Sequence, residues 1–176
     1  MDWPKEIARM AIVKHALSEA DQQKLWPYYL PEVASTTEDI IKAEAILGFK
    51  IDELFTNFLL FANGWKGFYQ YVDLFGTQDL IGGTRMEYAL GLLNTIEDSY
   101  FVQKGIVRQD LMPIAATLID KDIFLLGKIN SPLSGQIIWH AGEEIEIFEN
   151  FNEFFMTMVD YNIEELNELR DSRFNS

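Results

Sequence analysis

The sequence predicts an α+β fold, a single domain in which helices pack on a mostly antiparallel sheet. Three observations support this prediction: amphipathic helical patterns come first, a close series of apolar strand candidates occupies residues 111–149, and helical patterns close the chain. Separate runs of helices and strands are typical of α+β folds, whereas α/β folds alternate them. With 176 residues, 48% of them hydrophobic, the chain can bury a large core without disulfides.

The first 30 residues predict a helix and a proline-containing plug, both part of the same domain as residues 31–176. Residues 3–17 show an apolar helical face, and Asp2 is a candidate cap. The stretch WPYYLPEVAS contains two prolines and therefore excludes regular structure. Its aromatic residues, Trp26, Tyr28 and Tyr29, are expected to cover the core rather than to bind a ligand.

Two helices are predicted next. Ser35-Thr36-Thr37-Glu38 matches a capping box with the serine as cap, and the helix that it opens runs to about Leu47, with Gly48 in a left-handed cap position. The second helix has the clearest pattern in the chain, because apolar residues recur at helical spacing from Ile51 to Ala62.

The motif Asn63-Gly64-Trp65 follows this helix and raises a question about the tryptophan. Asparagine and glycine tolerate positive φ best, so the pair is expected to stop the helix and turn the chain. Trp65 is then either a core residue, which we favour, or an anchor at the centre of a binding interface.

The rest of the chain predicts one strand, a helix, four strands and two short helices. Residues 68–75, FYQYVDLF, indicate a strand, and residues 85–97 an amphipathic helix. The four later strand candidates are LMPIAATL, IFLLGK, QIIWHA and EIEIFE. The last of these alternates strictly and follows Ala141-Gly142, which indicates a hairpin. The closing helices are expected to begin after the caps Asn150 and Asn162.

The chain is strongly acidic, with 28 acidic and 14 basic residues and a net charge of −14. Residues 141–176 hold ten acids and two bases, and thus −8 of that charge. Such a field repels nucleic acid and anionic membrane surfaces and attracts basic partners. The alternative is an acidic surface that serves solubility only. The absence of cysteine is compatible with the cytoplasm, and the N-terminus does not match a signal peptide.

The sequence gives no sign of catalysis, a cofactor or a metal. It has two histidines, His15 and His140, and neither comes with a nucleophile in a known motif. It contains no phosphate-binding glycine loop and no G-x-S-x-G. Asp120 and Asp122 have the first spacing of a calcium loop, but Phe124 occupies the next ligand position. We therefore expect a binding protein and not an enzyme.

The order of these motifs resembles the SUKH superfamily, which includes the yeast cell-wall-assembly regulator and many bacterial immunity proteins. The resemblance covers about residues 35–160. It rests on a series of short matches: Glu44, Leu47-Gly48, Phe58, Leu59, Asn63-Gly64, Leu74, Pro113-Ile114-Ala115, Gly135, Ile137, Phe151, Phe154 and Phe155. Two turns depart from the usual pattern, at Lys50-Ile51 and at Asp120-Lys121-Asp122.

The resemblance implies an α+β fold without catalysis and, in bacteria, an immunity protein that binds and blocks a toxin. A nuclease toxin must attract a polyanion, so an acidic inhibitor suits its basic surface. The alternative function is a regulatory scaffold of the cell-wall-regulator type. The chain is expected to be a monomer or a weak dimer. The candidate partner-binding residues are Trp65, Trp139, His140, Glu143, Glu144 and Glu146.

Overall fold

A computed structural model describes the backbone of residues 1–174 and the side chains of residues 1–171. Its centre is a six-stranded antiparallel sheet with the strands in sequence order, β1-β2-β3-β4-β5-β6. The strands are β1 (Trp65–Tyr69), β2 (Val72–Leu74), β3 (Leu111–Ala116), β4 (Ile123–Gly127), β5 (Ile137–His140) and β6 (Glu144–Phe148). The α+β prediction is therefore confirmed.

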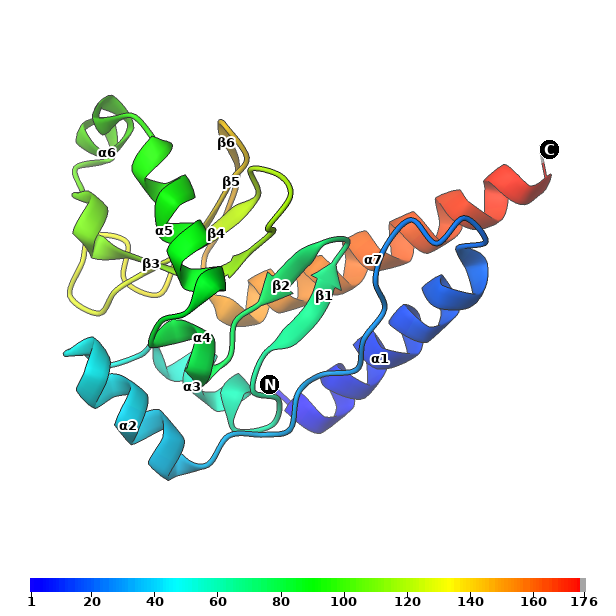
Figure 1. Ribbon diagram of the computed structural model, residues 1–176, viewed down its shortest axis with the longest axis horizontal. Coiled ribbons are helices and arrows are strands. Elements are labelled where there is room, and N and C mark those ends of the chain that lie inside the picture. The colour runs from blue at the N-terminus through cyan, green and yellow to red at the C-terminus, as the bar shows by residue number, and fades with distance from the viewer. Residues whose placement is uncertain (175–176) are drawn as a thin grey trace.

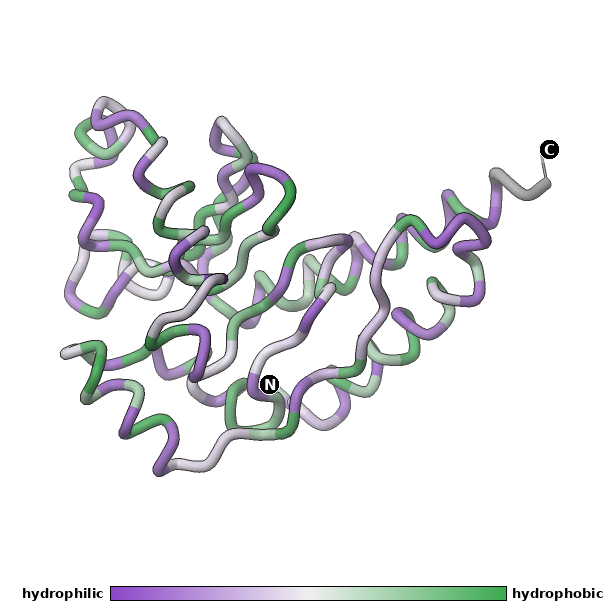
Figure 2. Tube along the Cα trace, viewed as in Figure 1, coloured by the Kyte–Doolittle hydropathy of each residue, from purple (hydrophilic) through white to green (hydrophobic). Residues whose placement is uncertain are grey.

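Seven α-helices and one short 3₁₀ helix surround this sheet in the described part of the chain (Figure 1). They are α1 (Trp3–Ala20), α2 (Thr37–Leu47), α3 (Glu53–Leu59), α4 (Thr77–Leu80), α5 (Thr84–Thr95), α6 (Asp98–Lys104), η1 (Arg108–Asp110) and α7 (Phe151–Phe174). Hydrophilic and hydrophobic residues alternate along α1 and α2, as amphipathic helices require (Figure 2). No helix among residues 1–174 combines the length and the apolar character that a membrane crossing needs.

The sheet is covered on both faces. Phe124 of β4 lies against Phe154 of α7, with 5.2 Å between the ring centroids. Neighbouring strand residues point to opposite faces, yet Ile123 and Leu125 are also buried, because α5 packs over β3 and β4. All five residues of β4 are consequently buried, as in a strand at the centre of a three-layer arrangement.

Helices α1 and α7 run side by side in the same direction (Figure 1). Near their N-termini, Trp3 of α1 packs edge-on against Phe155 of α7, at 5.2 Å between ring centroids. Further along, Val13, Leu17 and Leu166 form a second apolar cluster. The N-terminal helix thus packs directly on the C-terminal helix.

The prediction of two closing helices is wrong, because α7 is one helix of 24 residues. Asn150 does cap it, since its Oδ1 accepts a hydrogen bond from the Glu153 backbone N–H at 3.1 Å. Asn162 is a fully buried mid-helix residue. Its amide donates to the backbone oxygens of Met158 and Phe68, and its Oδ1 accepts from Lys14 Nζ at 3.3 Å. The side chain that indicated a cap therefore ties α7 to β1 and α1.

Two further local predictions need correction. The capping box lies one residue later than expected, with Thr36 as cap and Asp39 as its partner, whereas Ser35 is buried and donates to the Leu59 backbone oxygen. The stretch FYQYVDLF is a hairpin and not one strand, because Gln70 adopts a φ of +50° and turns β1 into β2.

Asn63 and Gly64 have separate roles. Helix α3 has already ended at Leu59, so the pair does not stop it. Gly64 alone takes positive φ, at +93°, and the backbone of Gly76 passes so close that a Cβ would lie 2.6 Å from its nitrogen. Asn63 Oδ1 accepts a hydrogen bond from the Thr77 backbone N–H at 2.7 Å. The motif therefore fastens the start of β1 to the start of α4.

Candidate functional site

Trp65 belongs to the core. Its side chain is fully buried, its ring lies 6.0 Å from that of Phe68, and its Nε1 donates to the backbone oxygen of Tyr29 at 2.8 Å. The core interpretation is confirmed, and the buried Trp65 side chain cannot contact a partner at the protein surface. The bond to Tyr29 also shows how the plug is held, since the indole is satisfied by the segment that covers it.

Trp139 and Glu146 face α7. The half-buried Trp139 ring stacks on Phe124 at 5.1 Å, and its Nε1 donates to Asp122 Oδ1 at 2.7 Å. Glu146, its neighbour across the hairpin, accepts a hydrogen bond from the Tyr161 hydroxyl of α7 at 2.8 Å. Both side chains therefore have structural partners on this face.

A β-bulge separates Glu146 from Glu144. Trp139 is paired with Glu146 and His140 with Glu144, so Ile145 is an extra residue on β6. Uninterrupted alternation would place both glutamates on the same face. The bulge instead leaves Glu146 beside α7 and turns Glu144 toward α6.

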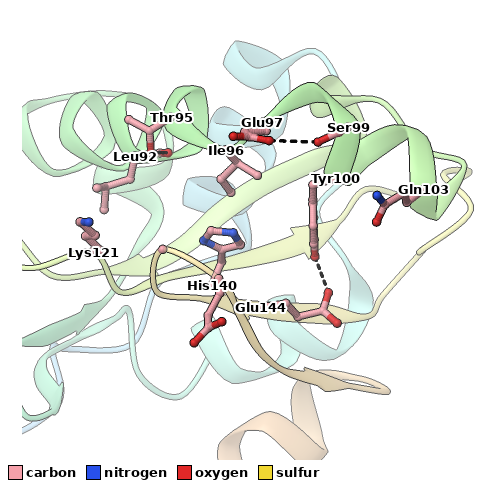
Figure 3. A pocket seen from close by; sticks show the side chains of 12 residues that line it. Leu92, Thr95, Ile96, Glu97, Ser99, Tyr100, Gln103, Lys121, His140 and Glu144 are labelled. Atoms are coloured by element: carbon pink, nitrogen blue, oxygen red, sulfur yellow. Dashed lines mark hydrogen bonds between the residues drawn. The ribbon is translucent and has the colours of Figure 1, made fainter.

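Three of the predicted residues meet in a groove between helices α5 and α6 and the β5–β6 hairpin. This groove has a volume of about 590 Å³, within the range of ordinary ligand pockets. His140, Glu143 and Glu144 line it from the hairpin. Figure 3 shows His140 and Glu144 on this side of the groove. Leu92 of α5, Tyr100 of α6, and Ile96 and Glu97 between these helices line the opposite side.

Arg108 holds the corner between the two helices. Its guanidinium donates to the backbone oxygens of Leu93 and Ile96 near the end of α5, at 3.0 and 2.9 Å. It also pairs with Asp98 at the start of α6, at 2.6 Å. One arginine thereby satisfies carbonyls that the helix end leaves open and fixes the direction in which α6 leaves α5.

Helix α6 is joined to the hairpin through Glu144. The Tyr100 hydroxyl donates to its carboxylate at 2.5 Å, and Lys104 Nζ lies 2.7 Å from it. Burial alone would raise the pKa of Glu144, but the hydrogen bonds from Lys104 and Tyr100 outweigh it and lower that pKa. Burial and the bond to Glu144 raise the pKa of Tyr100, which keeps the phenol protonated. Glu144 is therefore ionised, and its bonds to Tyr100 and Lys104 hold it in the wall of the groove.

Glu97 and Glu143 are the less restrained carboxylates. Both are exposed, and Glu97 accepts a hydrogen bond from Ser99 at 3.2 Å. Lys121 is the single cation among the twelve lining residues. The rim of the groove thus carries an excess of negative charge.

His140 lies inside the groove. Burial lowers its pKa, and Glu144 and Glu143 oppose that shift only in part, so the imidazole is neutral at pH 7. The Tyr100 ring meets it edge-on, at 5.6 Å between centroids and 82° between planes. The residues described do not offer three or more metal-binding side chains in one cluster. The groove is suited to bind a polar or cationic group.

Sequence reasoning missed the α6 side of the groove. The segment from Glu97 to Gly105 contains signals that could have predicted a short helix, with acids at the cap and in the first turn and lysine then glycine at its end. Its pairing with Glu144, 40 residues from Lys104, has no local signal, because only the folded chain brings them together.

The sequence and the α+β fold agree with a known family. The sequence model of the SMI1 / KNR4 family (SUKH-1) matches residues 34–157, which is more than half of the chain. The chain therefore belongs to this family, and the resemblance read from its motifs is confirmed. No curated protein matches the sequence.

Proposed function

We propose that this protein is an immunity protein of the cytoplasm that binds a basic toxin domain, such as a nuclease, and blocks it without catalysis. The observation that carries the proposal is the acidic groove, where Glu97, Glu143 and Glu144 come together beside α6 and the hairpin. Membership of the SUKH-1 family supports this class of function.

The electrostatics favour such a partner. A net charge of −14 repels nucleic acid and attracts a domain that must itself bind a polyanion. Charges at the rim of an interface act mainly on the association rate, through steering that salt screens over about 10 Å at 0.1 M. The exposed Glu97 and Glu143 are placed to act in this way.

The test needs a toxin-like domain as the partner, and the genes adjacent to the one for this chain are the place to search for it. The purified chain is expected to inhibit that domain at equimolar amounts, and inhibition should weaken as salt rises. The variant Glu97→Lys/Glu143→Lys should slow association more than it speeds dissociation. The matched control is Glu164→Lys/Glu168→Lys, which changes net charge equally at exposed positions on α7. Equal effects of the two variants would show that the charge of the whole chain, and not the groove, governs binding.

The family name favours a second candidate, a regulatory scaffold of the SMI1 / KNR4 type with several weaker partners. The gene context separates the two functions. A gene next to one for a large secreted protein with a toxin-like C-terminal domain favours immunity, whereas an isolated gene favours regulation. Turnover of a nucleotide, sugar or peptide by the pure chain would contradict both.

A further inference from the structure

His140 lines the groove, and no hydrogen bond found among the described residues ends on its imidazole. His140 is 8% exposed, and the Tyr100 ring meets its imidazole edge-on. Neither ring nitrogen is among the fully buried side-chain atoms that lack a partner. Figure 3 shows the ring in the space between Ile96 and Tyr100. A neutral imidazole carries one donor and one acceptor nitrogen, and in an open groove both can bond water or a ligand. This ring is therefore free to accept a hydrogen bond from a group that enters the groove.

The surroundings of the ring select the charge of that group. Glu97, Glu143 and Glu144 line the same groove against one lysine, Lys121. The Glu144–Tyr100 pair already holds one cation, since Lys104 Nζ also lies 5.3 Å from the centroid of the Tyr100 ring. An anion would meet the carboxylates of Glu97 and Glu143, which no lysine neutralises in this way, and an apolar side chain would cover the imidazole without bonding it.

We propose that the groove is the receptor for an arginine side chain of the protein partner, with its guanidinium bonded to His140 and to the rim carboxylates Glu97 and Glu143. This proposal rests on the proposed function, because the arginine is supplied by the toxin. A planar guanidinium presents several donors in fixed directions, so it can bond a carboxylate and the ring nitrogen together. Its flat faces suit the apolar side chains of Leu92 and Ile96, which also line the groove. An ammonium is a compact, strongly hydrated point charge and matches this arrangement less well.

The chain has two histidines, so the imidazole NMR signals of His140 can report binding while those of His15 serve as an internal control. The imidazole NMR signals of the full chain are followed while Nα-acetyl-arginine N-methylamide is added at constant ionic strength. We expect a saturable shift of the His140 signals. The His15 signals should stay in place, since that side chain is 73% exposed on α1 and away from the groove.

Two comparison compounds, the citrulline and lysine analogues of the arginine compound, and two variants of the chain complete the experiment. The citrulline analogue has the same shape without the charge, and it should bind at least about tenfold more weakly, as should the lysine analogue. Glu143→Gln should weaken arginine binding by about three- to tenfold, because it removes one charged partner. Glu149→Gln, an exposed carboxylate outside the groove, should leave it unchanged.

Several results would overturn the proposal. They are binding of the citrulline or lysine analogue as tight as that of the arginine compound, equal shifts of the two histidine signals, or an unchanged dissociation constant for the arginine compound in Glu143→Gln. A chain that inhibits the toxin but does not bind the arginine compound would contradict this inference alone. A chain that binds the compound at His140 but leaves the toxin active would contradict the proposed function alone.

Discussion

Replacing Trp65 by alanine tests whether this residue is a core side chain or a binding anchor. The indole is fully buried, packs beside Phe68 and donates to the Tyr29 backbone oxygen. Loss of a buried tryptophan costs about 3–5 kcal/mol, because the apolar contacts disappear and a cavity remains. Domains of 150–250 residues lose about 2–4 °C in Tm per kcal/mol, so Trp65→Ala should lower Tm by roughly 6–20 °C.

Two further variants separate the contribution of the indole N–H from that of the buried ring. Trp65→Phe keeps a large apolar ring but removes the N–H donor, and it should cost about 1–2 kcal/mol. Tyr29→Ala removes a side chain that is 54% exposed but keeps the backbone oxygen that accepts the bond, so it should cost under about 1 kcal/mol.

Urea unfolding followed by far-UV circular dichroism measures all three variants, and the signal does not depend on the tryptophan count. A free energy of unfolding for Trp65→Ala within about 1 kcal/mol of the wild-type value would contradict the core position of Trp65, since an interior indole cannot be removed at that cost. An equal loss of stability in Tyr29→Ala and Trp65→Ala would contradict it as well.

Three other predictions concern backbone strain, the buried polar network and pH. Gly64→Ala should lower the free energy of unfolding by about 2–4 kcal/mol, because a Cβ there would lie 2.6 Å from backbone at a φ of +93°. Gly48 has a φ of +76° but open space around it, so Gly48→Ala should cost only about 1 kcal/mol in the same denaturation assay. Asn162→Leu should lower the free energy of unfolding by about 2–5 kcal/mol, because Lys14 Nζ and the Phe68 oxygen lose their hydrogen-bond partner. Adding Lys14→Met should recover part of that loss in a double-mutant cycle, and full additivity would show that the two residues are not coupled. The pKa of His140 is lowered from 6.5 by burial, so the unfolded chain takes up this proton at a higher pH than the folded chain. Stability relative to His140→Asn should therefore fall as the pH drops below about 6.5 and stay constant above it, and a flat difference between pH 5 and 8 would contradict this assignment.

Local patterns predicted most of the elements in the sheet and the longer helices. The apolar spacing of residues 51–62 and 85–97 was sufficient because each helix buries one face, and the strand candidates from residue 111 onward correspond to β3, β4, β5 and β6. The same reasoning mistook Asn162 for a cap, because an asparagine that bonds across the core has the same local signature as one that bonds its own helix.

The candidate site could be predicted only in part. His140, Glu143 and Glu144 are close in sequence, and the hairpin signal at Ala141-Gly142 was enough to expect them on one turn. Glu146 was expected with them, but a single extra residue in β6 placed it on the other face. Alternation in the sequence cannot reveal such a bulge, because the bulge depends on pairing with β5.

The sequence by itself determined the family, the α+β class, the acidic character and the positions of most helices and strands, because periodicity, caps and charge act over a few residues. Only the tertiary structure decided that Trp65 lies in the core, that α6 pairs with Glu144, and that a groove forms around His140. These outcomes depend on contacts between segments tens of residues apart, whose free energy appears only when the chain has packed both faces of the sheet.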